Sequence, residues 1–189
     1  MNVIQTAPVA AMPDARLEPA NGRHVGTRRA YCYRHRVSFE DTNLVGNVYF
    51  AHYLSWQGRC RELFLLEHAP GVLAALEGSL RLVTLNVACE YFAELQALDE
   101  IEIAMMLVHQ RQHRIKLAFD YRLIGRIAKE PMNREAGGAR AGSAGPISGS
   151  AITLAARGTQ EVGCMQHTAD GLIPYPVPIE LASALDAFR

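Results

Sequence analysis

Apolar residues alternate with polar ones in several stretches of the chain and recur at helical spacing in another. The clearest alternation lies in 113–125, where every second residue is apolar from Ile115 to Leu123, and it predicts a strand with one buried face. Similar patterns predict four further strands, at 31–39, 80–92, 100–109 and 150–167. The stretch 48–67 predicts one helix about 30 Å long, and 72–77 adds a helical turn after Pro70 and Gly71.

This order of elements is a strand, a long helix and then four strands in a meander. Antiparallel strands with one apolar face need a cover, and the long helix is the natural one. The sequence therefore predicts an α+β fold in which a curved antiparallel five-stranded sheet wraps around one long central helix. Strict alternation in 80–92 would place Leu85, Val87 and Tyr91 on one face, and Leu82 and Thr84 on the other.

Two stretches lack such a pattern. Residues 1–28 are rich in Pro and Gly and predict a flexible N-terminal arm, and Gly, Ala and Ser in 126–148 predict a mobile loop. The remainder, 29–189, is expected to form a single domain. With one sheet and one long helix, such a domain is expected to complete its burial by dimerising.

Composition excludes several classes of protein. In 189 residues, Lys plus Arg and Asp plus Glu number 19 each, so the basic excess of a nucleic-acid binder is missing. No apolar run reaches the ~18 residues that a membrane span needs. The first residues show neither the basic nor the long apolar region of a secretory signal, so we expect none. We expect a cytoplasmic protein with no nucleic-acid or membrane partner.

The cysteines are Cys32, Cys60, Cys89 and Cys164. They lie far apart and form no C-x-x-C pair or Cys/His cluster, so we expect free thiols and no metal site. No sequence feature calls for a cofactor.

The loop before the helix is the most informative segment. Gly46 allows backbone conformations that other residues avoid, and Asn47 is a good N-cap for a helix that begins at Val48. The first N–H groups of such a helix could hold a developing oxyanion. Arg61 lies among apolar neighbours on the shoulder of the helix, where it either snorkels, joins a structural ion pair or serves a site.

The segment from Asp41 to Tyr49, DTNLVGNVY, resembles hot-dog-fold thioesterases of the 4-hydroxybenzoyl-CoA thioesterase type, whose pattern is D-T-D-x-x-G-H-V-Y before a helix. Here Asn43 replaces the second acidic residue and Asn47 replaces the histidine. A narrower group shares both departures. The string TNLVGNVY, followed by WQGRCRE at 56–62, resembles the thioesterases of enediyne antibiotic biosynthesis.

That resemblance implies a substrate and a set of site residues. The group releases a linear polyene from the acyl carrier domain of an iterative polyketide synthase, as an acid or, after loss of CO₂, as a methyl ketone. Its catalytic asparagine, arginine, tyrosine and threonine correspond to Asn43, Arg61, Tyr53 and Thr84. We expect the neighbours Gly46, Asn47, Val48, Phe50, Leu54 and Gln57 to bind the substrate.

An amide cannot act as a nucleophile or base, so the chemistry must depend on other effects. Asn43 would orient water or the thioester carbonyl, Arg61 would supply positive charge and Tyr53 a hydrogen bond. One oxyanion donor contributes roughly 3–4 kcal/mol, whereas a positioned base adds ~10²–10⁴-fold, so we expect a slow enzyme. A long apolar tunnel would hold the polyene. The candidates to line it, which could equally be ordinary core residues, are Phe50, Leu54, Phe92, Met105 and Met106.

One distance means that either the Asn43 loop folds back along the helix or a second subunit contributes to the site. Asn47 and Arg61 lie 14 residues apart, which is ~21 Å along one helix, so they cannot both reach one carbonyl. The resemblance implies a site at a dimer interface and a homotetramer built as a dimer of dimers.

Three other functions stay open from the sequence. An acyl-CoA thioesterase of the same fold would need a basic patch for the nucleotide. A dehydratase would need a His and a carboxylate in the site. An acyl-binding module would bind its ligand without turnover.

Overall fold

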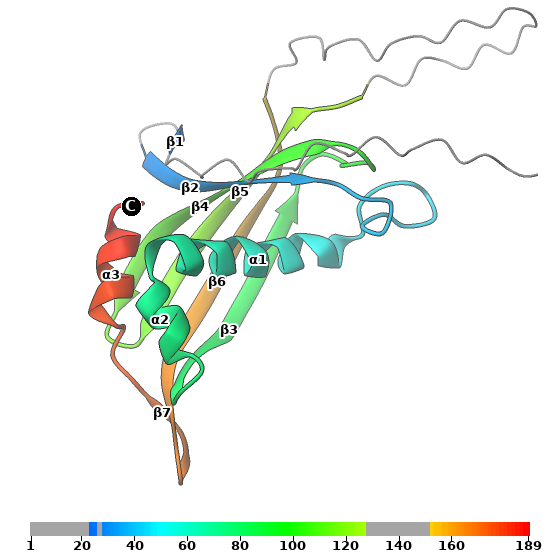
Figure 1. Cartoon of the computed structure of the whole chain (residues 1–189). Coiled ribbons are helices and arrows are strands. Elements are labelled where there is room, and N and C mark those ends of the chain that lie inside the picture. The colour runs from blue at the N-terminus through cyan, green and yellow to red at the C-terminus, as the bar shows by residue number, and fades with distance from the viewer. Residues whose placement is uncertain (1–22, 26–27, 128–151) are drawn as a thin grey trace, which may run out of the picture.

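One curved antiparallel sheet dominates the computed structural model, which describes residues 23–25, 28–127 and 152–189 (Figure 1). Its five long strands, given in spatial order, are β2 (Arg28–Arg36), β4 (Glu100–Arg111), β5 (Arg114–Gly125), β6 (Thr153–Thr168) and β3 (Leu80–Tyr91). The predicted five-stranded sheet and the sequence order of a strand, a long helix and four strands are confirmed. The predicted meander is wrong, because β3 pairs with β6 at the edge of the sheet and β2, not β3, lies next to β4.

Two short strands extend this sheet beyond the prediction. β1 (Arg23–Val25) pairs with the start of β2, and β7 (Gly171–Pro174) forms a hairpin with the end of β6. Residues 23–25, predicted as part of a flexible arm, are therefore a strand. Arg28, also predicted in that arm, is the first residue of β2. The remaining arm residues, 1–22 and 26–27, and most of the predicted loop, 128–148, lie outside the described residues.

The long helix α1 (Phe50–His68) crosses the strands on one face of the sheet, as predicted (Figure 1). It buries Tyr53, Trp56, Gln57, Cys60, Phe64 and Leu65. Two shorter helices close one end of this layer, α2 (Pro70–Ala75) and α3 (Ile179–Asp186). Pro70 interrupts α1 but then occupies the first turn of α2, where a missing N–H costs nothing.

Inward-facing strand residues and the helix form one core. The predicted alternation of β5 is confirmed, since Ile115, Leu117, Phe119 and Tyr121 are buried while Arg114 is exposed. The Tyr121 hydroxyl donates to the backbone carbonyl of Tyr53 at 2.6 Å and so ties the strand to the helix. Met106 belongs instead to a small cluster with Ala30, Cys32 and Ala104, apart from the main core. Its predicted place in a substrate tunnel is therefore wrong.

The edge strand β3 contains a bulge that the sequence did not indicate. Thr84 pairs with Val162 and Asn86 with Glu161, so Leu85 is an extra residue without a partner in register. Leu82 packs on the core before the bulge and Cys89 after it. Because the extra residue inverts the alternation, the strict two-face assignment predicted for 80–92 is wrong.

The described part of the chain has no helix long and apolar enough to cross a membrane. All four cysteines are free thiols, as expected.

The fit of α1 against β6 depends on one small residue. A side chain at Gly158 would run into the Gln57 amide group. We expect Gly158→Ala to lower the free energy of unfolding by about 1–3 kcal/mol, the usual cost of overpacking a core. Urea unfolding followed by circular dichroism measures this.

Gly58→Ala is the matched control, because a methyl group there meets nothing within 4 Å. In the middle of a helix this change should stabilise by up to about 1 kcal/mol. Equal effects of the two substitutions would contradict the close contact at Gly158.

Candidate functional site

The segment before α1 forms a tight, closed loop. Thr42 and Val48 pair as an isolated bridge, and the Asn43 N–H donates to the Asn47 carbonyl at 2.9 Å. Gly46 has a φ of +90°, which confirms the expected need for glycine. At the tip, Leu44 and Val45 point into solvent.

Asn47 does not cap the helix, contrary to the prediction. It pairs with Gln96 as an isolated bridge, α1 begins at Phe50, and Tyr49 occupies the N-cap without a side-chain hydrogen bond. The reason is that the segment 92–99 runs alongside this loop, with the Val48 N–H donating to the Leu95 carbonyl at 2.9 Å. Tertiary pairing therefore keeps Asn47 and Val48 extended, and the expected oxyanion site at Asn47 is absent from this helix start.

Asp41 anchors the base of the loop. Its Oδ2 atom accepts hydrogen bonds at 2.8 Å from both the N–H and the hydroxyl of Ser38. His35 and His52 lie 3.4 Å from its two oxygens. Burial raises the pKa of the Asp41 carboxyl, but the hydrogen bonds from Ser38 and His35 outweigh burial and hold it below its ordinary value.

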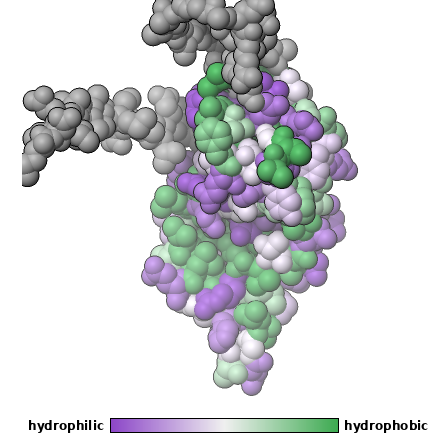
Figure 2. Space-filling model, turned by 90° about the vertical axis from the view of Figure 1, so that its right-hand side faces the viewer, coloured by the Kyte–Doolittle hydropathy of each residue, from purple (hydrophilic) through white to green (hydrophobic). Residues whose placement is uncertain are grey.

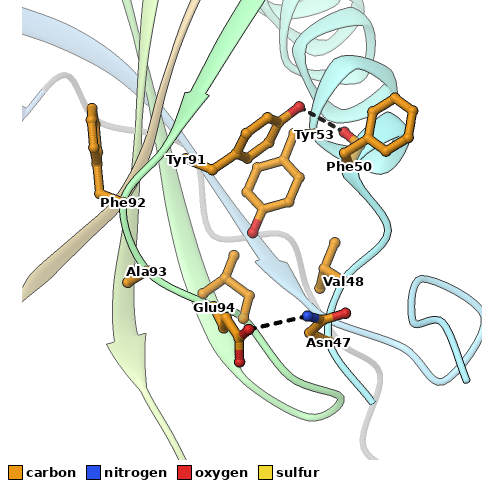
Figure 3. A pocket seen from close by; sticks show the side chains of 9 residues that line it. Asn47, Val48, Phe50, Tyr53, Tyr91, Phe92, Ala93 and Glu94 are labelled. Atoms are coloured by element: carbon orange, nitrogen blue, oxygen red, sulfur yellow. Dashed lines mark hydrogen bonds between the residues drawn. The ribbon is translucent and has the colours of Figure 1, made fainter. Parts of the chain in front are cut away.

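A pocket of about 280 Å³ opens between this loop, the start of α1 and the end of β3 (Figure 3). Its lining includes Val48, Phe50, Tyr53, Tyr91 and Phe92, with Asn47 and Glu94 as its polar groups. The Tyr53 hydroxyl points toward the end of the pocket that holds Asn47 and Glu94 (Figure 3).

Both tyrosines of this pocket are hydrogen-bond donors at neutral pH. Burial, with the nearby Cys89 and Tyr91, raises the pKa of Tyr53. Burial, with Cys89, also raises the pKa of Tyr91 to about 12. The Tyr91 hydroxyl donates to the Phe50 carbonyl at 3.1 Å, which links the edge strand to the start of the helix.

Arg61 lies two helical turns beyond Tyr53 and does not line this pocket. Its Nη1 atom donates to Gln160 Oε1 at 3.1 Å and, more weakly, to Thr84 Oγ1 at 3.4 Å. Burial lowers the pKa of this guanidinium while Glu62 opposes the shift, and an arginine stays charged regardless. Next to it is an apolar hollow of about 10 Å³, which Met105 also lines.

Gln57 lies between these two places, one helical turn from both Tyr53 and Arg61. It is fully buried, and its Nε2 atom donates to the Ala88 carbonyl at 3.3 Å. Its Oε1 atom has no hydrogen-bond partner among the residues that the structure describes. A buried oxygen without a hydrogen bond is rare in folded proteins, so Gln57 is a candidate functional residue.

The predicted site residues thus fall into two groups within one protomer. Gly46, Asn43 and Asn47 belong to the loop, and Val48, Phe50 and Tyr53 line the pocket beside it. Arg61 and Thr84 lie together elsewhere, and Leu54 is half-buried on α1.

The sequence reasoning missed two polar residues at these places. Gln160 is a buried amide on the apolar face of β6, and that polar position among alternating apolar residues could have indicated it. Glu94 follows the predicted strand in an irregular segment, where no pattern distinguishes it. In the described ranges no His, Cys, Asp or Glu cluster could hold a metal ion.

The chain is similar to known proteins both in sequence and in fold. A family model described as thioesterase-like superfamily matches residues 37–185. The dynemicin thioesterase, whose crystal structures revealed induced-fit and allosteric effects upon polyene binding, is 46% identical, with a TM-score of 0.68 and coverage of 84% of this chain and 96% of that one. No curated protein matches the chain.

Two more distant structures share the fold alone. A 1,4-dihydroxy-2-naphthoyl-CoA thioesterase from Synechocystis is 18% identical over 83% of this chain and 96% of that one, with a TM-score of 0.59. A mutant of 4-hydroxybenzoyl-CoA thioesterase, complexed with 4-hydroxybenzoyl-CoA, is 12% identical over 82% and 98%, with a TM-score of 0.63.

The Asp41 contacts predict a pH-dependent loss of stability. Asp41→Asn should lower the free energy of unfolding by about 1–3 kcal/mol at neutral pH, because charged hydrogen bonds are lost. Since the folded-state pKa lies below the unfolded value of about 3.9, this difference should be constant above about pH 5 and shrink below about pH 4. Urea unfolding across this pH range measures it.

Glu40→Gln is the control, since Glu40 is an exposed neighbouring carboxylate. It should change stability by less than about 0.5 kcal/mol. A difference for Asp41→Asn that persists unchanged at pH 3 would assign the loss to side-chain shape rather than charge.

Proposed function

Because the chain belongs to the thioesterase-like superfamily and is a thioester hydrolase of the hot-dog fold, we propose that its substrate is a β-keto polyene held on the acyl carrier domain of an iterative enediyne polyketide synthase. The product is a linear polyene acid, which yields a methyl ketone on loss of CO₂. The 46% identity to a polyene-binding thioesterase supports this class of acyl group.

The observation that carries the proposal is the placement of Arg61. Its guanidinium is held by Gln160 and Thr84 at the interface of α1 with the sheet, beside an apolar hollow. A fixed cation at such a position suits a β-keto thioester, which can carry negative charge on its enolate or on the tetrahedral oxyanion. The apolar surroundings strengthen the electrostatic interaction.

We propose that the complete site forms between two protomers. Asn43 and Arg61 do not meet within one chain, and β3 is an edge strand of the sheet. Leu85, Val87, Tyr91 and Phe92, on and just after this strand, are all exposed. Figure 2 shows hydrophobic side chains gathered on this side of the molecule.

An apolar edge strand is prone to pair with another chain. Pairing of β3 with its copy would bury these side chains and bring the partner's loop, with the exposed Leu44 at its tip, toward Arg61. Two such dimers would make the tetramer that the sequence resemblance implies.

Hydrolysis then requires only water and the fixed polar groups. Water attacks the thioester carbon, the C–S bond breaks, and a proton from water ends on the departing thiolate. Arg61 stabilises the charge that develops on the carbonyl oxygen, with Thr84 and Gln160 fixing its orientation. Asn43 and Tyr53 orient the reacting groups by hydrogen bonds, so no residue of the chain needs to form a covalent intermediate.

The role of Arg61 predicts a large loss of activity. Arg61→Ala should lower kcat/KM for an acyl-carrier-bound β-keto thioester by about 10²–10³-fold, the usual effect of removing one oxyanion donor. Mass spectrometry of the released acyl product measures this. Arg59→Ala, an exposed arginine of the same helix, is the control and should act like the unchanged protein. Full activity of folded Arg61→Ala would refute the proposal.

A shared site predicts complementation between inactive variants. Asn43→Ala and Arg61→Ala are each expected to keep only a small residual activity, but unfolding and refolding them together in equal amounts should restore about a quarter of full activity, because half of the dimers are mixed and each holds one intact site. Size-exclusion chromatography confirms reassembly. No recovery in reassembled mixed dimers would place both residues of a site on one protomer.

The substrate proposal is tested on the unchanged protein. If it hydrolyses the matching acyl-CoA as fast as the acyl-carrier-bound thioester, a soluble acyl-CoA is favoured as the substrate.

A further inference from the structure

A carboxylate lies at the polar end of the pocket, although the loop motif contains an amide where related proteins have an acid. Glu94 lines the pocket together with Asn47 and Tyr53 (Figure 3). It stands beside Leu95, which is fully buried and accepts the Val48 N–H. This pairing of two backbone segments holds Glu94 next to Asn47.

The side chains of Glu94, Asn47 and Asn43 form a continuous hydrogen-bonded chain. Asn47 Nδ2 donates to Glu94 Oε1 at 3.3 Å, and Asn43 Nδ2 donates to Asn47 Oδ1. At the far end, Asn43 Oδ1 accepts the Val45 N–H at 3.0 Å. The chain therefore runs from a carboxylate, through two amides, to the backbone of the loop tip.

The carboxylate gives this chain one direction. An ionised carboxylate only accepts hydrogen bonds, so Asn47 must turn its NH₂ group toward Glu94 and its oxygen toward Asn43. Asn43 must then turn its own NH₂ group toward Asn47. An asparagine amide by itself has no such preference, since its two ends are nearly equal in shape and differ only in donating and accepting.

We propose that Glu94 is a positioning residue that acts through Asn47 to set the orientation of the Asn43 amide in the catalytic site. This inference rests on the proposed function for its link to catalysis. The oriented amide keeps one N–H and one lone pair for the reacting groups, in fixed places. Successive hydrogen bonds also polarise one another, so the charge on Glu94 makes Asn43 Oδ1 a better acceptor for a proton of the attacking water.

The rival role for Glu94 is direct proton abstraction from water. Its hydrogen bond to Asn47 favours the positioning role, because the carboxylate is already engaged in holding an amide. The two roles differ in whether the effect of Glu94 depends on Asn43, and this dependence can be measured.

The kinetic test uses Glu94→Gln, Asn43→Ala and the double variant on an acyl-carrier-bound β-keto thioester. A glutamine keeps the size of the side chain but can donate, so it removes the direction of the chain. We expect kcat to fall by about 10–100-fold, the scale of a misplaced reacting group, with KM nearly unchanged. In the Asn43→Ala background, Glu94→Gln should cause no further loss.

A second readout does not depend on activity. The side-chain amide resonances of Asn43, assigned by their disappearance in Asn43→Ala, should shift in Glu94→Gln in ¹⁵N-labelled protein. Glu77→Gln, which changes an exposed carboxylate in the turn after α2, is the control and should leave both kcat and these resonances unchanged. Melting temperatures establish that each variant is folded.

The outcomes separate the two proposals. An equal loss of kcat in both backgrounds would overturn the positioning role in favour of a base. Unchanged kcat and unchanged Asn43 resonances in Glu94→Gln would overturn any role for Glu94. If the unchanged protein releases no polyene while the resonances shift as expected, the proposed function fails but the hydrogen-bonded chain stands.

Discussion

The packing of α1 against the concave face of the sheet determines where the site residues of the helix lie. Tyr53, Trp56, Cys60 and Phe64 are buried in that contact, and each such side chain contributes roughly 1.5–3 kcal/mol on burial. The helix is therefore held in one register on the sheet. Tyr53, Gln57 and Arg61 follow one another at intervals of one turn, and this register alone decides that they face β3 and β6.

Three polar side chains lie in this apolar layer although the packing does not require them: Gln57, Arg61 and Gln160. Gln57 leaves an oxygen without a partner in the described part of the chain, and Gln160 accepts a hydrogen bond from the half-buried Arg61 rather than packing like its neighbours. A core of apolar residues would be at least as stable, because burying polar groups is costly unless every bond is made. Such departures from the most stable packing are what a binding site requires.

The edge strand β3 joins the fold to the chemistry. Before the bulge, Thr84 lies on the same face as Leu82 and contacts Arg61. The bulge at Leu85 then turns the odd-numbered residues toward the helix, so that the Tyr91 hydroxyl reaches Phe50. The same strand leaves apolar side chains exposed along the edge of the sheet. One element thus supplies a site residue, a wall of the pocket and the surface through which we propose that a second copy completes the site.

Local pattern determined the elements of this protein, whereas contacts between distant segments decided its site. The alternation in the strands and the helical spacing of apolar residues in α1 were sufficient to predict the strands, the central helix and their order in the sequence, because burial of one face imposes a period on the sequence. The bulge in β3 left no such period, and the eight residues of α3, with Leu181 and Leu185 buried one turn apart, are too few for a secure pattern. The motif around Asn43 indicated the family and the loop, and Gly46 showed its special backbone conformation in the sequence itself. Tertiary structure alone decided that Asn47 pairs with the segment 92–99 instead of capping α1, and that Glu94 stands beside it. These residues are 47 positions apart, and no local preference of either one encodes the meeting of two loops that the folded sheet brings together.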